Sequence, residues 1–247
     1  MSPPSQISST ESHGVLPRYK SIAALDKAIT ACTLCPRLVE WRQEVAITKR
    51  AAYADHDYWG KPVTGFGDSK AEIIIVGLAP GAHGANRTGR IFTGDSSGDF
   101  LFPALHRAGL AKLPISDSRS DGQELIRTRI LCAVRCAPPG NKPTTQEKVT
   151  CSPFMANEIE LLMPTTKVFV ALGNFAWTGL IAQLLSMGFE IPSPRPKFGH
   201  GAVFKVRSES GKAIKVIGSY HPSQQNTFTK KLTPAMLDGI FKMANEA

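Results

Sequence analysis

Short apolar runs alternate with longer amphipathic segments along most of the chain. Residues 72–76, 129–134 and 167–172 are almost continuously apolar, which is typical of strands buried on both faces of a sheet. A fourth strand is predicted within 212–220, paired in a hairpin with residues 192–206. Helical spacing occupies 22–32, 37–59, 98–110, 146–163, 173–186 and the stretch from Thr233 onward. This alternation predicts an α/β fold, a three-layer αβα sandwich with a central four-stranded parallel sheet.

Local signals mark the ends of several elements. Residues 1–17 are polar and rich in Ser and Pro, so we expect a disordered tail, followed by a single domain over 18–247. Pro153 predicts a break in the helix at 146–163, and the polar segment 111–124 predicts a surface excursion. Helix N-caps are expected at Ser21, at Ser97 or Asp99, and at Thr144 or Thr145.

Polar, turn-rich loops follow three of the predicted strands. Their sequences are GLAPGAHGANRTGRIFTGD at 77–95, RCAPPGNKPT at 135–144 and HPSQQNT at 221–227. Because the carboxyl ends of parallel strands meet at one edge of a sheet, these loops should converge on one ligand site.

Composition narrows the class of protein. Of the 247 residues, 42% are hydrophobic and 20% charged, as in ordinary globular proteins. The net charge of +9 favours anionic partners, nucleic acid first and an acidic membrane surface second. No apolar run is long enough to span a bilayer, and the N-terminus lacks the apolar region of a signal peptide. We therefore expect a cytoplasmic protein with no membrane partner.

The chain has five cysteines, and four of them have the spacing of possible metal ligands. Cys32 and Cys35 form a CxxC pair, and fourteen residues separate Cys136 from Cys151. Four thiolates can hold zinc or a [4Fe–4S] cluster, and the spacing alone does not choose between them or exclude unrelated structural cysteines. Cys132 lies inside an apolar strand, where a thiol is expected to behave as a small hydrophobe.

The three loop sequences and the cysteine pattern together resemble the uracil-DNA glycosylase superfamily, specifically its family 5 (the UDGb type). The likeness runs from about Cys32 to Thr233. It implies an iron–sulfur protein in which Cys32, Cys35, Cys136 and Cys151 hold a [4Fe–4S] cluster. It also implies an αβα sandwich and hydrolysis of the N-glycosidic bond of a flipped nucleotide, by a monofunctional enzyme of base excision repair.

The resemblance also assigns residues to the chemistry. His221 is expected to donate a hydrogen bond to the uracil carbonyl as negative charge develops, and Phe92 to stack on the flipped base. Ala79 stands where other members of the superfamily have a polar residue that activates water. Asp95 is therefore expected to take this role, as a catalytic residue together with His221 and Asn141.

Further residues are expected to bind the substrate. Those facing the base are Gly77, Ala79, Gly81, Phe92 and Cys132; the last occupies the position of an Asn that pairs with uracil in family 4. This difference fits a wider range of bases, including hypoxanthine and ethenocytosine. The residues expected to contact double-stranded DNA are Arg87, Arg90, Ser223, Gln224, Gln225, Asn226, Lys230 and Lys231. A monomer that is associated with the nucleoid is expected.

Two other functions are compatible with the sequence. A non-catalytic iron–sulfur protein that binds DNA as a damage or redox sensor would explain the absence of a water-activating side chain at Ala79. A relative that crosslinks to uracil-containing DNA through a histidine would need a basic insertion after the first loop, and ANRTGRIF at 85–92 does not resemble one.

Overall fold

The computed structural model describes residues 17–247. Apart from Pro17, the predicted disordered tail lies outside the described residues. The centre of the fold is a six-stranded sheet in the order β1-β3-β2-β4-β6-β5. The four inner strands are parallel to one another: β2 (Ile73–Gly77), β3 (Thr128–Cys132), β4 (Val168–Leu172) and β6 (Ala213–Ser219).

Two antiparallel strands extend this parallel core at its edges. The first, β1 (Phe66–Gly67), pairs with β3, and the second, β5 (Val203–Arg207), pairs with β6. The parallel core is therefore confirmed, and the sheet is two strands wider than the four predicted. The hairpin expected before the last parallel strand is the β5–β6 pair.

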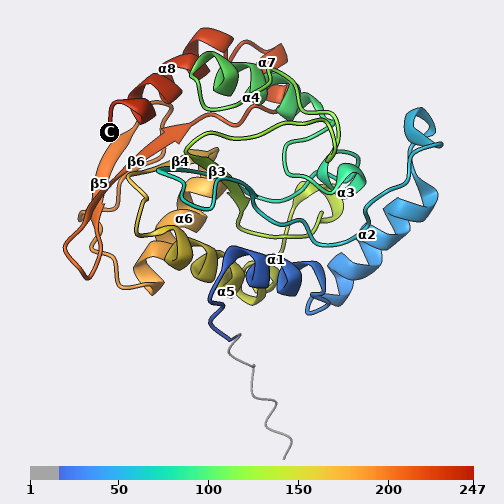
Figure 1. Ribbon diagram of the computed structural model, residues 1–247, viewed down its shortest axis with the longest axis horizontal. Helices are drawn as coiled ribbons and strands as arrows, with labels where there is room; N and C mark the ends of the chain where they lie inside the picture. Colours follow the sequence, from blue (N-terminus) through green and yellow to red (C-terminus); the bar gives the residue numbers. More distant parts are fainter. Residues whose placement is uncertain (1–16) are drawn as a thin grey trace, which may run out of the picture.

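Helices cover both faces of the sheet (Figure 1). On one face α4 (Ser96–Arg107) and α8 (Pro234–Asn245) pack against Ile73 and Ile75 of β2. On the other face α5 (Thr145–Leu162) and α6 (Asn174–Ser186) pack against Ile74 and Val76. Successive residues of one strand thus enter different cores, which explains why the strands are apolar without alternation. The α/β sandwich is confirmed.

The remaining helices lie beside these layers. α1 (Ile22–Thr30) and α2 (Pro36–Thr48) contribute to a third buried cluster together with α5. The short elements are η1 (Ala51–Tyr53), α3 (Ala85–Thr88), η2 (Pro139–Asn141) and α7 (Gln224–Phe228). Within residues 17–247 no helix is both long and apolar enough to cross a bilayer.

Several helix ends match the sequence signals and others do not. Ser21 caps α1, and Thr144 caps α5 in a capping box with Glu147. The break expected at Pro153 is wrong, because α5 continues through it. Proline leaves the carbonyl of Val149 without its helical donor, and the hydroxyl of Ser152 donates to that oxygen at 2.9 Å instead.

Two further helix boundaries differ from the prediction. The helix predicted over 37–59 ends at Thr48, and Lys49 takes a positive φ of 53°. The expected caps Ser97 and Asp99 are wrong, because Asp95 caps α4.

The segment 111–124 is more than a surface excursion. Ser116 and Gln123 within it are buried, and the side chain of Asp121 pairs with Arg90. The segment therefore packs against the loop that follows β2.

Candidate active site

A cavity of about 820 Å³ opens at the carboxyl ends of the parallel strands. Its walls include the loops that follow β2, β4 and β6, together with Asn141 from the loop after β3. The chain proceeds from β2 to β3 on one side and then crosses to β4 on the other, so the strand order reverses between β2 and β4. A crevice at such a switch point is the usual ligand site of an open α/β sheet. The predicted convergence of the three loops is therefore observed.

The inner wall of the cavity is built around Phe92. This residue has a φ of 52°, a left-handed conformation that turns its ring back toward β2, where it is 7% exposed. A β-carbon at Gly77 would lie 3.1 Å from both the Phe92 ring and Cys132 Sγ. Glycine at this strand end therefore lets the aromatic ring pack against the backbone.

His221 lies next to this ring. The centroids of Phe92 and His221 are 5.8 Å apart and their planes are tilted by 36°. A base sandwiched between two rings needs about 7 Å, two van der Waals contacts of about 3.5 Å each, so the two side chains do not clamp a base between them. Phe92 and His221 therefore adjoin each other in one wall of the cavity.

The surroundings of His221 fix its charge and position. Burial lowers the pKa of the imidazole to about 4, so the ring is neutral at pH 7. Asn226 Nδ2 donates to the His221 carbonyl at 2.8 Å and holds the turn before α7. A neutral ring can donate one N–H to a carbonyl oxygen without being an acid.

Within residues 17–247, only one carboxylate oxygen of Asp95 accepts hydrogen bonds. Its Oδ1 accepts hydrogen bonds from the backbone N–H groups of Ser97 and Gly98, both at 3.0 Å. Within residues 17–247 its Oδ2 accepts no hydrogen bond, and it lies against the backbone of Gly81 and Gly84 at the wall of the cavity. Burial raises the pKa of this carboxyl group above its ordinary value. Asp95 thus offers a free, unusually basic oxygen.

The remaining predicted catalytic and base-facing residues divide into two groups. Ala79, Gly81 and Asn141 line the cavity, and Asn141 is exposed with a φ of 57°. Gly77 and Cys132 lie behind the wall. Cys132 is 2% exposed and belongs to the hydrophobic core, and burial raises the pKa of its thiol, so it remains protonated.

The two arginines of the first loop do not point to solvent. Arg87 is buried, donates to the carbonyls of His83 at 2.7 Å and Gly94 at 2.5 Å, and stacks on Tyr53 at 3.9 Å. Arg90 is buried and pairs with Asp121. The expected phosphate contacts of Arg87 and Arg90 do not fit this placement, because both guanidinium groups are used to shape the loop.

The loop after β6 is open to solvent at the mouth of the cavity. Gln224 and Gln225 are exposed in α7, which begins at the N-cap Ser223. Lys231 also reaches the cavity, with its Nζ 4.9 Å from the centroid of the Tyr220 ring. Lys230 is exposed but outside the cavity. The cavity residues from this loop are Ser223, Gln224, Gln225, Asn226 and Lys231.

Many cavity residues were not predicted from the sequence, among them Arg50, Tyr53, His83 and Phe175. Arg50 and Tyr53 come from the segment after α2, whose position depends on tertiary packing. His83 lies in the first loop, and its Nδ1 is 3.0 Å from the hydroxyl of Tyr58. Phe175 is 62% exposed just after β4. The rule that loops after all parallel strands share one edge could have indicated Phe175, because β4 lies between β2 and β6.

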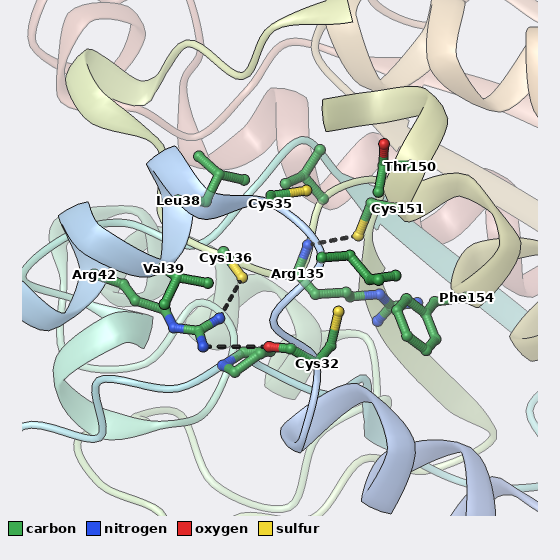
Figure 2. A pocket seen from close by; sticks show the side chains of 13 residues that line it. Cys32, Cys35, Leu38, Val39, Arg42, Arg135, Cys136, Thr150, Cys151 and Phe154 are labelled. Atoms are coloured by element: carbon green, nitrogen blue, oxygen red, sulfur yellow. Dashed lines mark hydrogen bonds between the residues drawn. The ribbon is translucent and has the colours of Figure 1, made fainter. Parts of the chain in front are cut away.

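The predicted cysteine ligands gather at a second, smaller cavity. Cys32 and Cys35 flank the turn between α1 and α2, Cys136 follows β3, and Cys151 lies in α5. Figure 2 shows their sulfur atoms around a common space, with apolar side chains closing it. Within residues 17–247 no group of three His, Cys, Asp or Glu side chains has the spacing needed to hold a single metal ion. Ala79 packs against this cluster and also lines the larger cavity.

The contacts of a buried arginine indicate whether the cysteine cavity could hold a negatively charged group. Arg42 is 3% exposed; its Nη1 lies 2.9 Å from Cys136 Sγ and its Nη2 donates to the Cys32 carbonyl at 3.2 Å (Figure 2). Among residues 17–247 no carboxylate forms an ion pair with it. A buried guanidinium needs a counter-charge, and metal-bound thiolates would supply one. The residues present therefore fit a metal–sulfur group.

Comparison with known proteins agrees with this geometry. The family model described as "Uracil DNA glycosylase superfamily" matches residues 64–244. A type-5 uracil-DNA glycosylase of Mycobacterium bovis is 51% identical over 226 residues, 92% of this chain and 81% of that protein. Proteins of the same name from Thermus thermophilus and Pyrobaculum aerophilum are 47% and 41% identical, covering 86% of this chain and 92% and 87% of their own lengths. The chain belongs to the uracil-DNA glycosylase superfamily, where it is similar to the type-5 proteins.

Proposed function

We propose that this protein is a DNA glycosylase of base excision repair that removes uracil from double-stranded DNA. The observation that carries the proposal is the meeting of Phe92, Asp95 and His221 in one cavity, from loops that are far apart in the sequence. Relatives named type-5 uracil-DNA glycosylase share 41% to 51% of their residues with this chain.

The base must leave the duplex to reach the cavity. An extruded uracil would stack on Phe92 and present its edge to His221. When the glycosidic bond breaks, electrons move to the base, and the neutral His221 ring donates an N–H to the oxygen on which negative charge develops. This interaction is stronger in the transition state than in the ground state, because the charge appears only as the bond breaks.

Asp95 would act on the other side of the broken bond. The sugar becomes positively charged in the transition state, and a nearby carboxylate stabilises that charge. The free Oδ2 can also orient a water molecule and take its proton as the water attacks the anomeric carbon. Ala79 has no polar atom for this task. We propose Asn141, on the exposed turn at the cavity rim, as a further polar contact to the sugar or the attacking water.

The DNA strand would pass over the loop after β6. Gln224 and Gln225 project from α7 and could fill the gap left by the extruded nucleotide, while Lys230 and Lys231 offer positive charge to the phosphates. We also propose that a monomer is sufficient for catalysis.

The wall behind Phe92 is compatible with a wider range of bases than uracil alone. The side chain there is the buried thiol of Cys132, and neither it nor Ala79 has an amide to pair with the polar edge of uracil. A pocket without such a partner discriminates weakly between bases. We therefore propose hypoxanthine and ethenocytosine as further substrates.

We propose that Cys32, Cys35, Cys136 and Cys151 hold a [4Fe–4S] cluster with a structural role. The four thiols line one cavity, and the buried guanidinium of Arg42, which has no carboxylate partner within residues 17–247, favours an anionic group there. When bound, the cluster would join α1, α2, β3 and α5 by thiolate bonds. Iron and sulfide analysis of protein purified without oxygen tests this; stoichiometric zinc with no iron would contradict it.

The activity is tested with matched duplexes that contain one uracil, hypoxanthine or ethenocytosine, each also supplied as a single strand. We expect release of the free base and an abasic site from the duplexes, and a much slower reaction with His221→Gln. No covalent adduct should form with borohydride, because water is the nucleophile. A folded protein that binds these duplexes but releases no base would instead support the non-catalytic sensor.

A further inference from the structure

The cysteine cavity contains buried N–H groups that have no acceptor. Arg42 Nε, Arg135 Nε and Arg135 Nη1 are all inaccessible to solvent and without a hydrogen-bond partner in residues 17–247. Arg135 is 1% exposed, and both arginines line the cavity. A buried donor without an acceptor destabilises the folded state, and it does so more strongly when it is charged. Three such donors at one cavity indicate an acceptor that the polypeptide alone does not provide.

The buried carboxylate that pairs with Arg135 is already engaged by two donors. Glu158 is completely buried and accepts from Arg135 Nη2 through one oxygen and from Arg129 Nε at 2.5 Å through the other. Apart from the hydroxyl of Thr150, the only side chains with lone pairs around the cavity are the four thiols. In Figure 2 the guanidinium groups of Arg42 and Arg135 approach the sulfur atoms from opposite sides.

We propose that Arg42 and Arg135 donate their free N–H groups to the sulfur atoms of the bound cluster and thereby set its reduction potential. This inference rests on the cluster assigned above. A cluster held by four thiolates is negatively charged, and it becomes more so on reduction. Positive charge and hydrogen bonds to sulfur stabilise the reduced form and raise the potential.

The two arginines are not equally suited to mutation. Removing Arg135 would leave Glu158 with one buried partner instead of two, and breaking a buried ion pair is strongly destabilising. Arg42 has no carboxylate partner among the described residues, so its replacement leaves no buried acid unpaired. Arg42→Gln is therefore the informative variant.

Arg37→Gln is the matched control. Arg37 lies on the same helix and carries the same charge, but its side chain is 44% exposed, pairs with Glu147 at 2.8 Å and does not line the cavity. Arg42→Lys keeps the charge while replacing the planar guanidinium by a single nitrogen.

The experiment measures the midpoint potential of the cluster in each protein by redox titration, following the signal of the reduced cluster by electron paramagnetic resonance. Iron content and circular dichroism are measured on the same samples. We expect a more negative midpoint in Arg42→Gln, a smaller shift in Arg42→Lys and the wild-type value in Arg37→Gln. A folded Arg42→Gln protein that loses its iron while Arg37→Gln keeps it would also support the proposal.

Two results would overturn the proposal, and they are distinguishable. If the wild-type protein contains no iron, both the cofactor assignment and this inference are wrong. If Arg42→Gln holds a full cluster whose midpoint potential equals that of the wild type, the cofactor assignment stands and only this inference is wrong. If Arg42→Gln does not fold, Arg42→Lys decides in the same way, because an unchanged midpoint there contradicts the role of the guanidinium.

Discussion

Asp95 combines a structural role and a proposed catalytic role in one carboxylate, and two substitutions can separate them. Its Oδ1 caps α4 by accepting from Ser97 and Gly98, while its Oδ2 is free at the cavity wall. Asparagine keeps an oxygen that can accept the two capping hydrogen bonds but loses the negative charge. Alanine loses both. Asp95→Asn therefore tests catalysis alone, and Asp95→Ala tests catalysis together with the cap.

The expected magnitudes differ for the two roles. Loss of an N-cap costs about 1 kcal/mol, whereas Asn and Asp are nearly equal as caps. In a domain of this size 1 kcal/mol lowers the melting temperature by about 2–4 °C. Loss of a general base lowers the rate by about 100- to 10,000-fold, which is about 3–5 kcal/mol of transition-state stabilisation.

The assay is single-turnover release of uracil from a duplex, with the melting temperature measured on the same preparations. We expect Asp95→Asn to melt like the wild type and to react at least about 100-fold more slowly. Asp95→Ala should react as slowly and also melt at a lower temperature. An Asp95→Asn protein with close to the wild-type rate would refute the catalytic role and leave Asp95 as a helix cap only.

Other predictions concern the same site. A β-carbon at Gly84 would lie 2.0 Å from Asp95 Oδ2, so Gly84→Ala should displace the carboxylate and slow excision as much as Asp95→Asn does; an unchanged rate would contradict the placement of Oδ2. The pH dependence of single-turnover excision should show a fall in rate as Asp95 becomes protonated, at a pH above the ordinary carboxyl pKa of 3.8, because burial raises its pKa. Protonation of His221 should not lower the excision rate near pH 6.5, because burial lowers its pKa to about 4 and the ring stays neutral above that value. A fall in rate near pH 6.5 that is absent in His221→Gln would be inconsistent with a neutral donor. Finally, Lys230→Gln or Lys231→Gln should each reduce the slope of log affinity against log salt by about 0.9 if that lysine neutralises one phosphate, and an unchanged slope would exclude the contact.

Much of the fold could be predicted because the sequence signals are local or follow from a simple rule. The apolar run that forms β2 requires burial on both faces, and the chain order then gives parallel strands with their loops at one edge. The same reasoning predicted that the loops carrying Asp95 and His221 lie at one site. These features depend on the period of the hydrophobic pattern and on topology, which are both visible in the sequence.

Other features depend on long-range partners that the sequence does not mark. Arg90 was predicted to contact phosphate, but it pairs with Asp121. This partner lies in a segment whose polar sequence predicted only a surface excursion. Pro153 should break α5, yet the neighbouring Ser152 satisfies the freed carbonyl. Arg50 reaches the cavity only because the chain turns back after α2. In each case a side chain or segment distant in sequence, or an unusual local hydrogen bond, overrides the general tendency.

The most direct test of the proposed site is a crystal structure of Asp95→Asn bound to a duplex that contains uracil. The substitution keeps the α4 cap and should slow cleavage enough to trap the intact nucleotide. We predict an extruded uracil stacked on Phe92, a His221 ring nitrogen within hydrogen-bond distance of a uracil oxygen, and residue 95 facing the anomeric carbon. A uracil held elsewhere, or a residue 95 separated from the sugar by protein, would contradict the account.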